Sequence, residues 1–208
     1  MDYNILFGFM TAVAALAMSP GPDNMYVLMQ SITNGRAFGL ATVAGLISGC
    51  LVHTTLVAFG VSAIIKANDS MFFTIKLLGA FYLFYLAYQV FRSDSRVALF
   101  NKNVPKNTLW RLFKQGFIMN VLNPKVSIFF LAFFPSFLFS NSLSHVSQFY
   151  VLGLLFMLVS FIIFSLIAIL AGFISDYLKS HKHVSSVLKW LQIIVFVGIA
   201  VFILLSEK

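Results

Sequence analysis

Two short stretches place ionisable side chains next to prolines inside long apolar runs. The first is Ser19-Pro20-Gly21-Pro22-Asp23, which Asn24 follows, and the second is Asn123-Pro124-Lys125, with Asn120 just before it. A carboxylate can accept hydrogen bonds from an ammonium group or exchange a proton, and a lysine ammonium can donate to a carboxylate. Together the two motifs predict a binding site for a small zwitterion.

The prolines determine what the backbone does at these motifs. A proline inside a helix removes a donor and clashes with the preceding turn, at a cost of about 3 kcal/mol. In lipid, irregular backbone survives only where protein or water surrounds it. Unwinding around Gly21 would leave a positive helix end for a substrate carboxylate, and bare carbonyls or Asp23 for its ammonium. Broken helices at matching positions in two halves indicate a transporter binding site.

Two simpler interpretations compete with a binding site. A single membrane proline ordinarily makes a kink that only shapes packing, and Asp23 and Lys125 could form a purely structural ion pair. A charge near the bilayer centre costs about 2.5–3.5 kcal/mol, so it is rarely kept without a compensating role. Their opposite signs predict that Asp23 and Lys125 face each other or share a water-filled cavity, and we prefer the functional interpretation.

Two further polar side chains lie inside apolar runs. Ala41, Gly45, Gly49 and His53 follow one another at four-residue spacing and therefore share one helix face. Gly45 and Gly49 form a small-xxx-small motif that lets another helix come close, so His53 is expected inside the bundle. It is either a buried, hydrogen-bonded histidine or a proton relay, because histidine titrates near neutral pH. Tyr82, in the next apolar run, is a candidate to line the cavity.

The composition places these residues in a membrane protein. Of 208 residues, 60% are hydrophobic and 10% are charged, whereas a soluble domain carries about 25% charged residues. The net charge is +8, and the lysines and arginines cluster between the apolar runs. They form no basic stripe interleaved with aromatic residues, which argues against nucleic-acid binding. The single cysteine, Cys50, excludes an intrachain disulfide. The opening Met1-Asp2-Tyr3-Asn4 lacks the positive charge of a signal peptide, so we expect the first apolar run to be retained.

Six apolar runs are long enough to cross a bilayer, which needs about 20 residues. They cover residues 5–29, 38–65, 71–91, 112–139, 146–174 and 187–205. The predicted fold class is an all-α polytopic membrane protein with six transmembrane helices, of which the first and fourth are broken by the proline motifs. Lysine and arginine gather in the loops after the first, third and fifth runs, and positive loops face the cytoplasm. Both termini are therefore expected on the outer side.

The two halves of the chain are expected to be repeats of inverted topology. With three spans in each half, the first and fourth runs cross the membrane in opposite directions. Gly8-Phe9 precedes the first proline motif as Gly116-Phe117 precedes the second. Inverted repeats are a common construction of secondary transporters. We predict one transporter domain, 1–208, with half-repeats of about 1–95 and 108–208 joined by a basic cytoplasmic loop.

These motifs resemble the LysE/RhtB family of amino acid exporters, of the homoserine, threonine and leucine efflux type. The first half is similar to that family through its proline-glycine motif and a series of spaced residues: Ser19-Pro20-Gly21-Pro22, Gly35-Arg36, Gly39, Gly45, Gly49, His53 and Gly60. The third and fourth helices of the family are matched by Gly79, Tyr82-Leu83, Tyr85-Leu86, Asn120, Asn123-Pro124-Lys125 and Pro135. The resemblance covers most of the chain and fades after about residue 145.

The resemblance implies a bacterial inner-membrane protein that exports amino acids or close derivatives, driven by proton antiport. In this interpretation Asp23 recognises protons and the substrate ammonium, and Lys125 balances it or meets the carboxylate. His53 is the second candidate for proton coupling, and unwound backbone around Gly21 and Asn123 forms the walls of the site. The expected partners are the substrate, protons and the lipid bilayer, with no cofactor or metal. Glycine-rich faces permit a homodimer without requiring one, and no residue identifies the amino acid carried.

Three other functions remain alternatives. An exporter of an inorganic ion would need several carboxylates, histidines or thiols close together, and only Asp23 and His53 are well placed. An intramembrane enzyme could use Ser19 and His53, but Ser19 is not in a Gly-x-Ser-x-Gly elbow and no orienting carboxylate is evident. A structural subunit without transport activity would gain nothing from charged, broken helices.

Overall fold

The computed structural model describes residues 2–67, 69–92, 107–180 and 182–205, and the regular elements within them are helices. The predicted basic loop falls largely on residues 93–106, which lie outside the described residues. In chain order the helices are α1 Tyr3–Met18, α2 Pro22–Asn34, α3 Arg36–Leu56, a π-helical turn Val57–Val61, α4 Ser62–Ala67, α5 Asp69–Arg92, α6 Leu109–Val121, α7 Pro124–Phe133, a 3₁₀ turn Phe134–Phe137, α8 His145–Ile169, α9 Ala171–Ser180 and α10 Lys182–Leu205.

Up to six of these segments can cross a membrane. Four continuous stretches are long and apolar enough by themselves: Arg36–Ile65, Phe73–Arg92, His145–Ile169 and Ser186–Leu205. Two more spans arise if each bent pair is counted as one, α1 with α2 bent by 58° and α6 with α7 bent by 52°. The prediction of a polytopic all-α membrane protein is confirmed, and the chain bends at both proline motifs.

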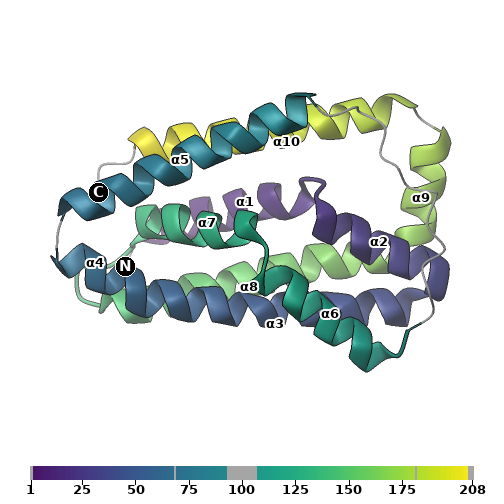
Figure 1. The fold of residues 1–208 in the computed structure, drawn as a ribbon, viewed down its shortest axis with the longest axis horizontal. Helices are drawn as coiled ribbons and strands as arrows, with labels where there is room; N and C mark the ends of the chain where they lie inside the picture. Colours follow the sequence, from purple (N-terminus) through teal and green to yellow (C-terminus); the bar gives the residue numbers. More distant parts are fainter. Residues whose placement is uncertain (1, 68, 93–106, 181, 206–208) are drawn as a thin grey trace.

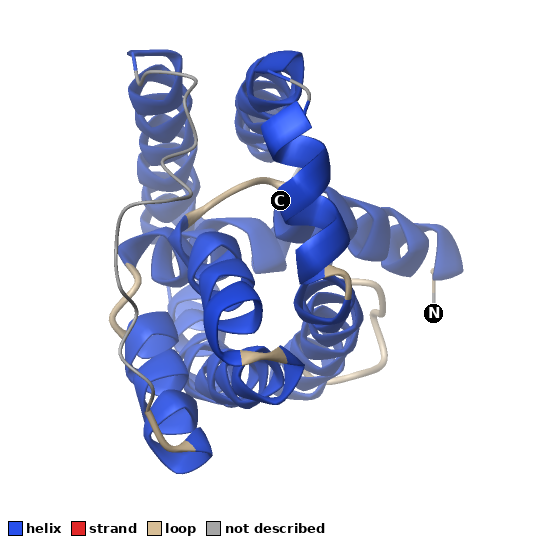
Figure 2. Cartoon of the chain, turned by 90° about the vertical axis from the view of Figure 1, so that its right-hand side faces the viewer, coloured by secondary structure: helices blue, strands red, loops and turns tan. Residues whose placement is uncertain are grey.

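The long helices run along the longest axis of the molecule (Figure 1). Both breaks lie near the middle of that axis, and the two broken spans run in opposite directions. The N- and C-terminal ends of the chain lie at the same end of the bundle, and α9 lies at the other. Figure 2, viewed from the end that carries α9, shows the long helices end-on.

The surface of the bundle is suited to lipid. In α8 the exposed positions include large apolar side chains: Leu154, Leu158, Phe161, Ile162 and Leu166. Several polar side chains in the described spans lie inside, among them Gln30, Thr42, His53, Asn120 and Gln148. Lipid accepts apolar surface at no cost, whereas a polar group inside a membrane protein must find its partners within the protein.

Glycines let α3 and α6 approach closely beside the second break. A Cβ on Gly45 would lie 2.0 Å from the carbonyl oxygen of Phe113, and one on Gly116 would lie 2.4 Å from that of Thr42. At Gly49 an added Cβ would meet the side-chain oxygen of Asn120 at 2.7 Å. The predicted small-xxx-small contact is therefore confirmed, and its partner is α6.

Stacked phenylalanines join the two broken spans. Phe9 of α1 meets the ring of Phe134 edge-on with centroids 5.2 Å apart, and Phe134 stacks on Phe130 of α7 at 4.2 Å. Phe156 of α8 adds an edge contact to Phe130 at 4.8 Å. Each such pair contributes about 0.5–1.5 kcal/mol beyond the burial of area. This cluster fixes α1, α7 and α8 against one another.

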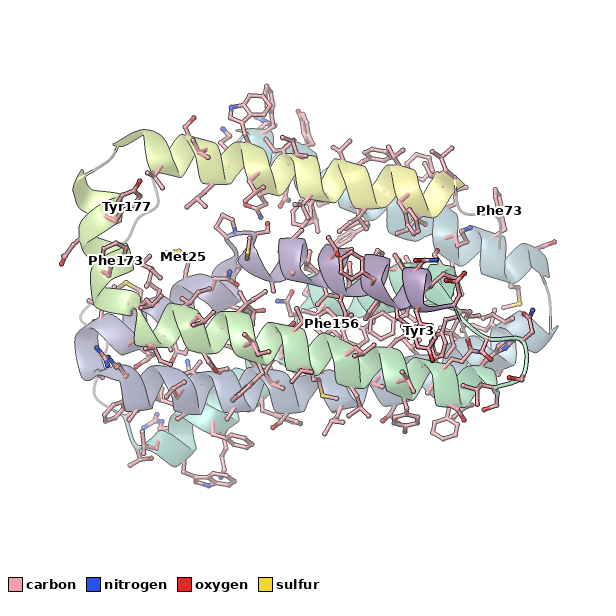
Figure 3. The ribbon with its side chains drawn as sticks, turned by 180° about the vertical axis from the view of Figure 1, so that it is seen from behind. Tyr3, Met25, Phe73, Phe156, Phe173 and Tyr177 are labelled. Atoms are coloured by element: carbon pink, nitrogen blue, oxygen red, sulfur yellow. The ribbon has the colours of Figure 1, made fainter. Side chains whose placement is uncertain are left out.

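The fifth span is shorter than the sequence predicts. We expected it to cover residues 146–174, but α8 ends at Ile169 and a separate helix, α9, begins at Ala171. Figure 1 shows α9 crossing the end of the bundle. Its exposed side carries Phe173 and Tyr177, whose rings stack with centroids 6.2 Å apart (labelled in Figure 3). An apolar run alone does not separate a crossing helix from an amphipathic one that follows it, which explains the wrong boundary.

Candidate functional site

Each broken span starts a second helix in the middle of the bundle. Pro22 begins α2 and Pro124 begins α7, the first helical position, where a missing N–H removes no hydrogen bond. Gly21 and Asn123 precede them in extended conformation as N-caps. The prolines therefore both end the first half of each span and allow the second half to begin.

The two breaks contact each other directly. The side-chain amide of Asn123 donates a hydrogen bond of 3.1 Å to the carboxylate of Asp23. The ammonium of Lys125 lies beside Gly21, 3.5 Å from the position that a Cβ on this glycine would take. The same ammonium lies 4.6 Å from the centroid of the Phe196 ring, a favourable cation–π distance.

Asp23 and Lys125 are opposite charges that line the same cavity and attract each other electrostatically. The hydrogen bond that the Asp23 carboxylate accepts comes from Asn123 and not from the Lys125 ammonium. A substrate can therefore approach both charged groups without first displacing a hydrogen bond between them.

The helix ends at the first break are not equivalent. The Asn24 amide donates to the carbonyl oxygens of Ala17 and Ser19, at 2.7 and 3.3 Å, and so satisfies the end of α1. The start of α2 has no side-chain cap, whereas the side-chain oxygen of Asn123 caps α7 by accepting from the backbone N–H of Lys125. Uncapped N–H groups at a helix start bind anions. The break therefore offers its free donors on the α2 side.

A cavity of about 50 Å³ lies between the breaks and the helices α3 and α8. Among its lining residues are the predicted site residues Ser19, Gly21, Pro22, Asp23, Asn24, Asn120, Asn123 and Lys125. The Ser19 hydroxyl and the Asn120 side-chain oxygen lack a hydrogen-bond partner among the described residues, although these residues are only 1% and 4% exposed. Buried polar atoms of this kind are rare and call for a partner.

Four predicted site residues do not line this cavity: Pro20, Pro124, Tyr82 and His53. Pro20 and Pro124 shape the breaks without facing it. Tyr82 is half-buried on α5, with its ring 6.1 Å from that of Tyr85, so the structure does not bring it to the site. The helix that carries it packs chiefly against α10 and α7.

His53 does not line the cavity but contacts Asn120, which does. It is 3% exposed, and its Nε2 atom lies 3.0 Å from the backbone carbonyl oxygen of Asn120. A carbonyl only accepts hydrogen bonds, so Nε2 carries the proton in this contact. His53 thus ties α3 to the end of α6, and through Asn120 it is adjacent to the cavity.

Sequence reasoning missed the walls that α3 and α8 contribute. From α3 come Ile47 and Cys50, and from α8 come Phe156, Ser160 and Phe164. The α8 residues stand four apart and so share a helix face. The signal that could have pointed to them is Ser160, a hydroxyl in the middle of a strongly apolar run.

Comparison with known proteins agrees with this architecture. Residues 14–207 match the profile of the LysE type translocators. The leucine efflux proteins of Salmonella typhimurium and Salmonella typhi are each 28% identical over 205 residues, which cover 96% of this chain and 95% of theirs. The homoserine/homoserine lactone efflux protein of Salmonella typhimurium is 28% identical over 189 residues, 91% of either chain. No solved structure matches. Since the profile match spans nearly the whole chain, this protein belongs to the LysE type translocator family.

Proposed function

We propose that this translocator exports amino acids or close derivatives across the bacterial inner membrane, in exchange for protons. The observation that carries the proposal is the meeting of Asp23 and Lys125, one from each broken span, in a single cavity. Relatives that match over nearly the full length are named as efflux proteins for leucine and for homoserine and its lactone. A carboxylate and an ammonium in one cavity suit the two charged groups that every amino acid carries.

The contacts suggest how a zwitterion binds. Its carboxylate lies between the Lys125 ammonium and the uncapped start of α2, where charge and helix dipole both favour an anion. Its ammonium meets Asp23, because the carbonyls of Ala17 and Ser19 already accept from Asn24. The unpartnered oxygens of Ser19 and Asn120 supply further acceptors for the ammonium.

Coupling follows if Asp23 holds either a proton or the substrate ammonium, but not both. Release of the substrate on the outer side then allows Asp23 to take a proton, and loss of that proton inside restores the binding form. Each ligand shifts the protein toward the state that binds it better. His53 is the second proton-coupling group, since its ring touches the peptide of Asn120 at the second break.

The cavity also indicates that the walls move. A volume of about 50 Å³ holds only a few water molecules, each of which needs roughly 10–15 Å³. An amino acid is larger, so it enters only when the broken spans separate from α3 or α8. Rocking of two inverted half-repeats, about 1–95 and 108–208, provides this movement around a fixed site. We place both termini on the outer side, because lysine and arginine gather in the loops at the other end of the spans.

The test uses purified protein in liposomes loaded with all twenty standard amino acids and homoserine. A pH gradient is imposed and the released compounds are quantified by mass spectrometry. We expect selective release of one or a few amino acids, lost in Asp23→Asn and kept in Asp176→Asn, which alters an exposed carboxylate on α9. If nothing leaves under either polarity of the gradient, the proposed function is wrong.

A further inference from the structure

The third wall of the cavity, on α8, has no role in binding the charged groups of a substrate. It consists of Phe156, Ser160 and Phe164, spaced four residues apart on an unbroken helix. Figure 3 labels Phe156 about midway along α8. Because the two breaks supply the groups for the carboxylate and the ammonium, the α8 face is left for the substrate's side chain.

The charges of the cavity restrict what that side chain is. Its lining contains one carboxylate, Asp23, and one ammonium, Lys125. Both are used by the two charged groups common to all amino acids, so neither is left for a third charge. The remaining lining is largely apolar, with Leu16, Ile47 and Val126 beside the phenylalanines of α8. A charged side chain would be buried there without a partner, at a high cost in free energy.

Ser160 is the polar exception on this face. The hydroxyls of Ser31, Ser62 and Ser165 are buried without a partner among the described residues, whereas those of Thr42 and Thr54 bond to the carbonyl four residues earlier, at 3.0 and 2.8 Å. This is the usual way to satisfy a hydroxyl inside a membrane helix. Ser160 is 2% exposed and has no such bond, nor any other partner among the described residues. Its hydroxyl is therefore free to bond to a group in the cavity.

We propose that the α8 face of Phe156, Ser160 and Phe164 selects the substrate's side chain, admitting short neutral side chains and favouring those with a hydroxyl. The two phenylalanines limit the length of the substrate side chain that fits, and Ser160 bonds to the hydroxyl of that side chain. This inference rests on the proposed function, since it assigns the specificity of the same site. A pocket built to bond a hydroxyl discriminates more strongly than one that only measures the size of an apolar group.

The experiment measures ratios within one mixture. Proteoliposomes are loaded with equal amounts of homoserine, threonine, valine, leucine, lysine and glutamate, and their efflux is quantified together. For the native protein we expect the neutral amino acids to leave and lysine and glutamate to stay. In Ser160→Ala, efflux of homoserine and threonine relative to valine and leucine should fall about three- to tenfold, the value of one neutral hydrogen bond. In Phe156→Ala and Phe164→Ala the ratio of leucine to valine should rise.

The chain offers a matched control in Ser165, on the same helix. Its hydroxyl is also buried and unpartnered among the described residues, but Ser165 does not line the cavity, so Ser165→Ala should leave every ratio unchanged. The inference is overturned if the native protein exports but Ser160→Ala shifts the ratios no more than Ser165→Ala, or if lysine or glutamate leaves as fast as leucine. If the native protein moves none of the mixture, the proposed function itself has failed.

Discussion

Asp23 is the one carboxylate among the residues that line the cavity. Replacing it with asparagine removes its charge and its ability to exchange a proton while nearly preserving its shape. A hydrogen bond to a charged group contributes about 1.5–3 kcal/mol, so the apparent affinity for substrate should fall about 10- to 100-fold in Asp23→Asn. The KM for export of the identified amino acid, measured in proteoliposomes, checks this.

Asp23→Glu provides the comparison, because it keeps the charge and changes only the reach of the side chain. It should retain gradient-driven export at a reduced rate. An Asp23→Asn protein that exports with native KM and native response to the pH gradient would remove Asp23 from both binding and coupling.

Two substitutions at His53 distinguish a structural role of this residue from a role in proton transfer. In His53→Gln a side-chain amide can still donate to the Asn120 carbonyl, so stability should stay near native. In His53→Leu that carbonyl loses a donor, and the protein should lose about 1 kcal/mol of unfolding free energy. If His53 relays protons, His53→Gln loses export driven by a pH gradient but keeps substrate exchange at equal pH. Full gradient-driven export by His53→Gln would leave His53 with its structural role alone.

The residues with unusual chemistry were found from sequence, whereas their neighbours were not. Asp23 and Lys125 could be predicted to meet because a charge inside an apolar run needs compensation, and their signs are opposite. Phe156 could not be assigned to the cavity, since the buried Phe156 and the exposed Phe161 are the same residue type in the same apolar helix. In lipid both faces of a helix tolerate phenylalanine, so only the packing decides which one faces inward.

The contact between α3 and α6 depends on glycine. Gly45→Ala places a methyl group against the backbone of Phe113, where neither helix can yield by changing a rotamer. The helices must separate, and overpacking of this kind costs about 1–3 kcal/mol. We expect a lower thermal unfolding temperature in detergent, accompanied by loss of export because α6 carries Asn120 to the site.

Gly198→Ala is the control for this substitution. Gly198 lies in α10, and an added Cβ there meets nothing within 4 Å. Its unfolding temperature should therefore equal or exceed that of the native protein, since alanine is the better helix former. If the Gly45→Ala protein is as stable as the Gly198→Ala protein, then α3 and α6 do not approach each other as closely as described here.

The elements themselves were predictable to different degrees. Proline motifs define the breaks in α1–α2 and α6–α7 because the ring excludes a continuous helix whatever surrounds it. The end of α8 was missed because hydropathy continues through Phe173 and Ile174, and the first polar residues, Ser175 and Asp176, come only inside the next helix. Local chemistry thus fixes breaks, whereas the direction of a helix after a break depends on tertiary packing.

The orientation of the whole molecule in the membrane is a further prediction. Cys50 is buried, so a Cys50→Ser background lets single cysteines report on either end of the bundle. We expect Ser142→Cys, in the exposed loop before α8, to react with an impermeant maleimide in intact cells whose outer membrane the reagent crosses. Gly172→Cys, at the opposite end on α9, should react only after the inner membrane is opened. The reverse pattern would place both termini in the cytoplasm.

The most direct test asks whether Asp23 and Lys125, from the two broken spans, act on the same substrate. The Kd of the identified amino acid is measured for the native protein, Asp23→Asn, Lys125→Gln and the double variant. Groups that share one ligand are coupled, typically by about 0.5–3 kcal/mol, so the loss of affinity in the double variant should be smaller than the product of the two single losses. If the two losses simply multiply, or if either single variant binds like the native protein, the two breaks do not form one site.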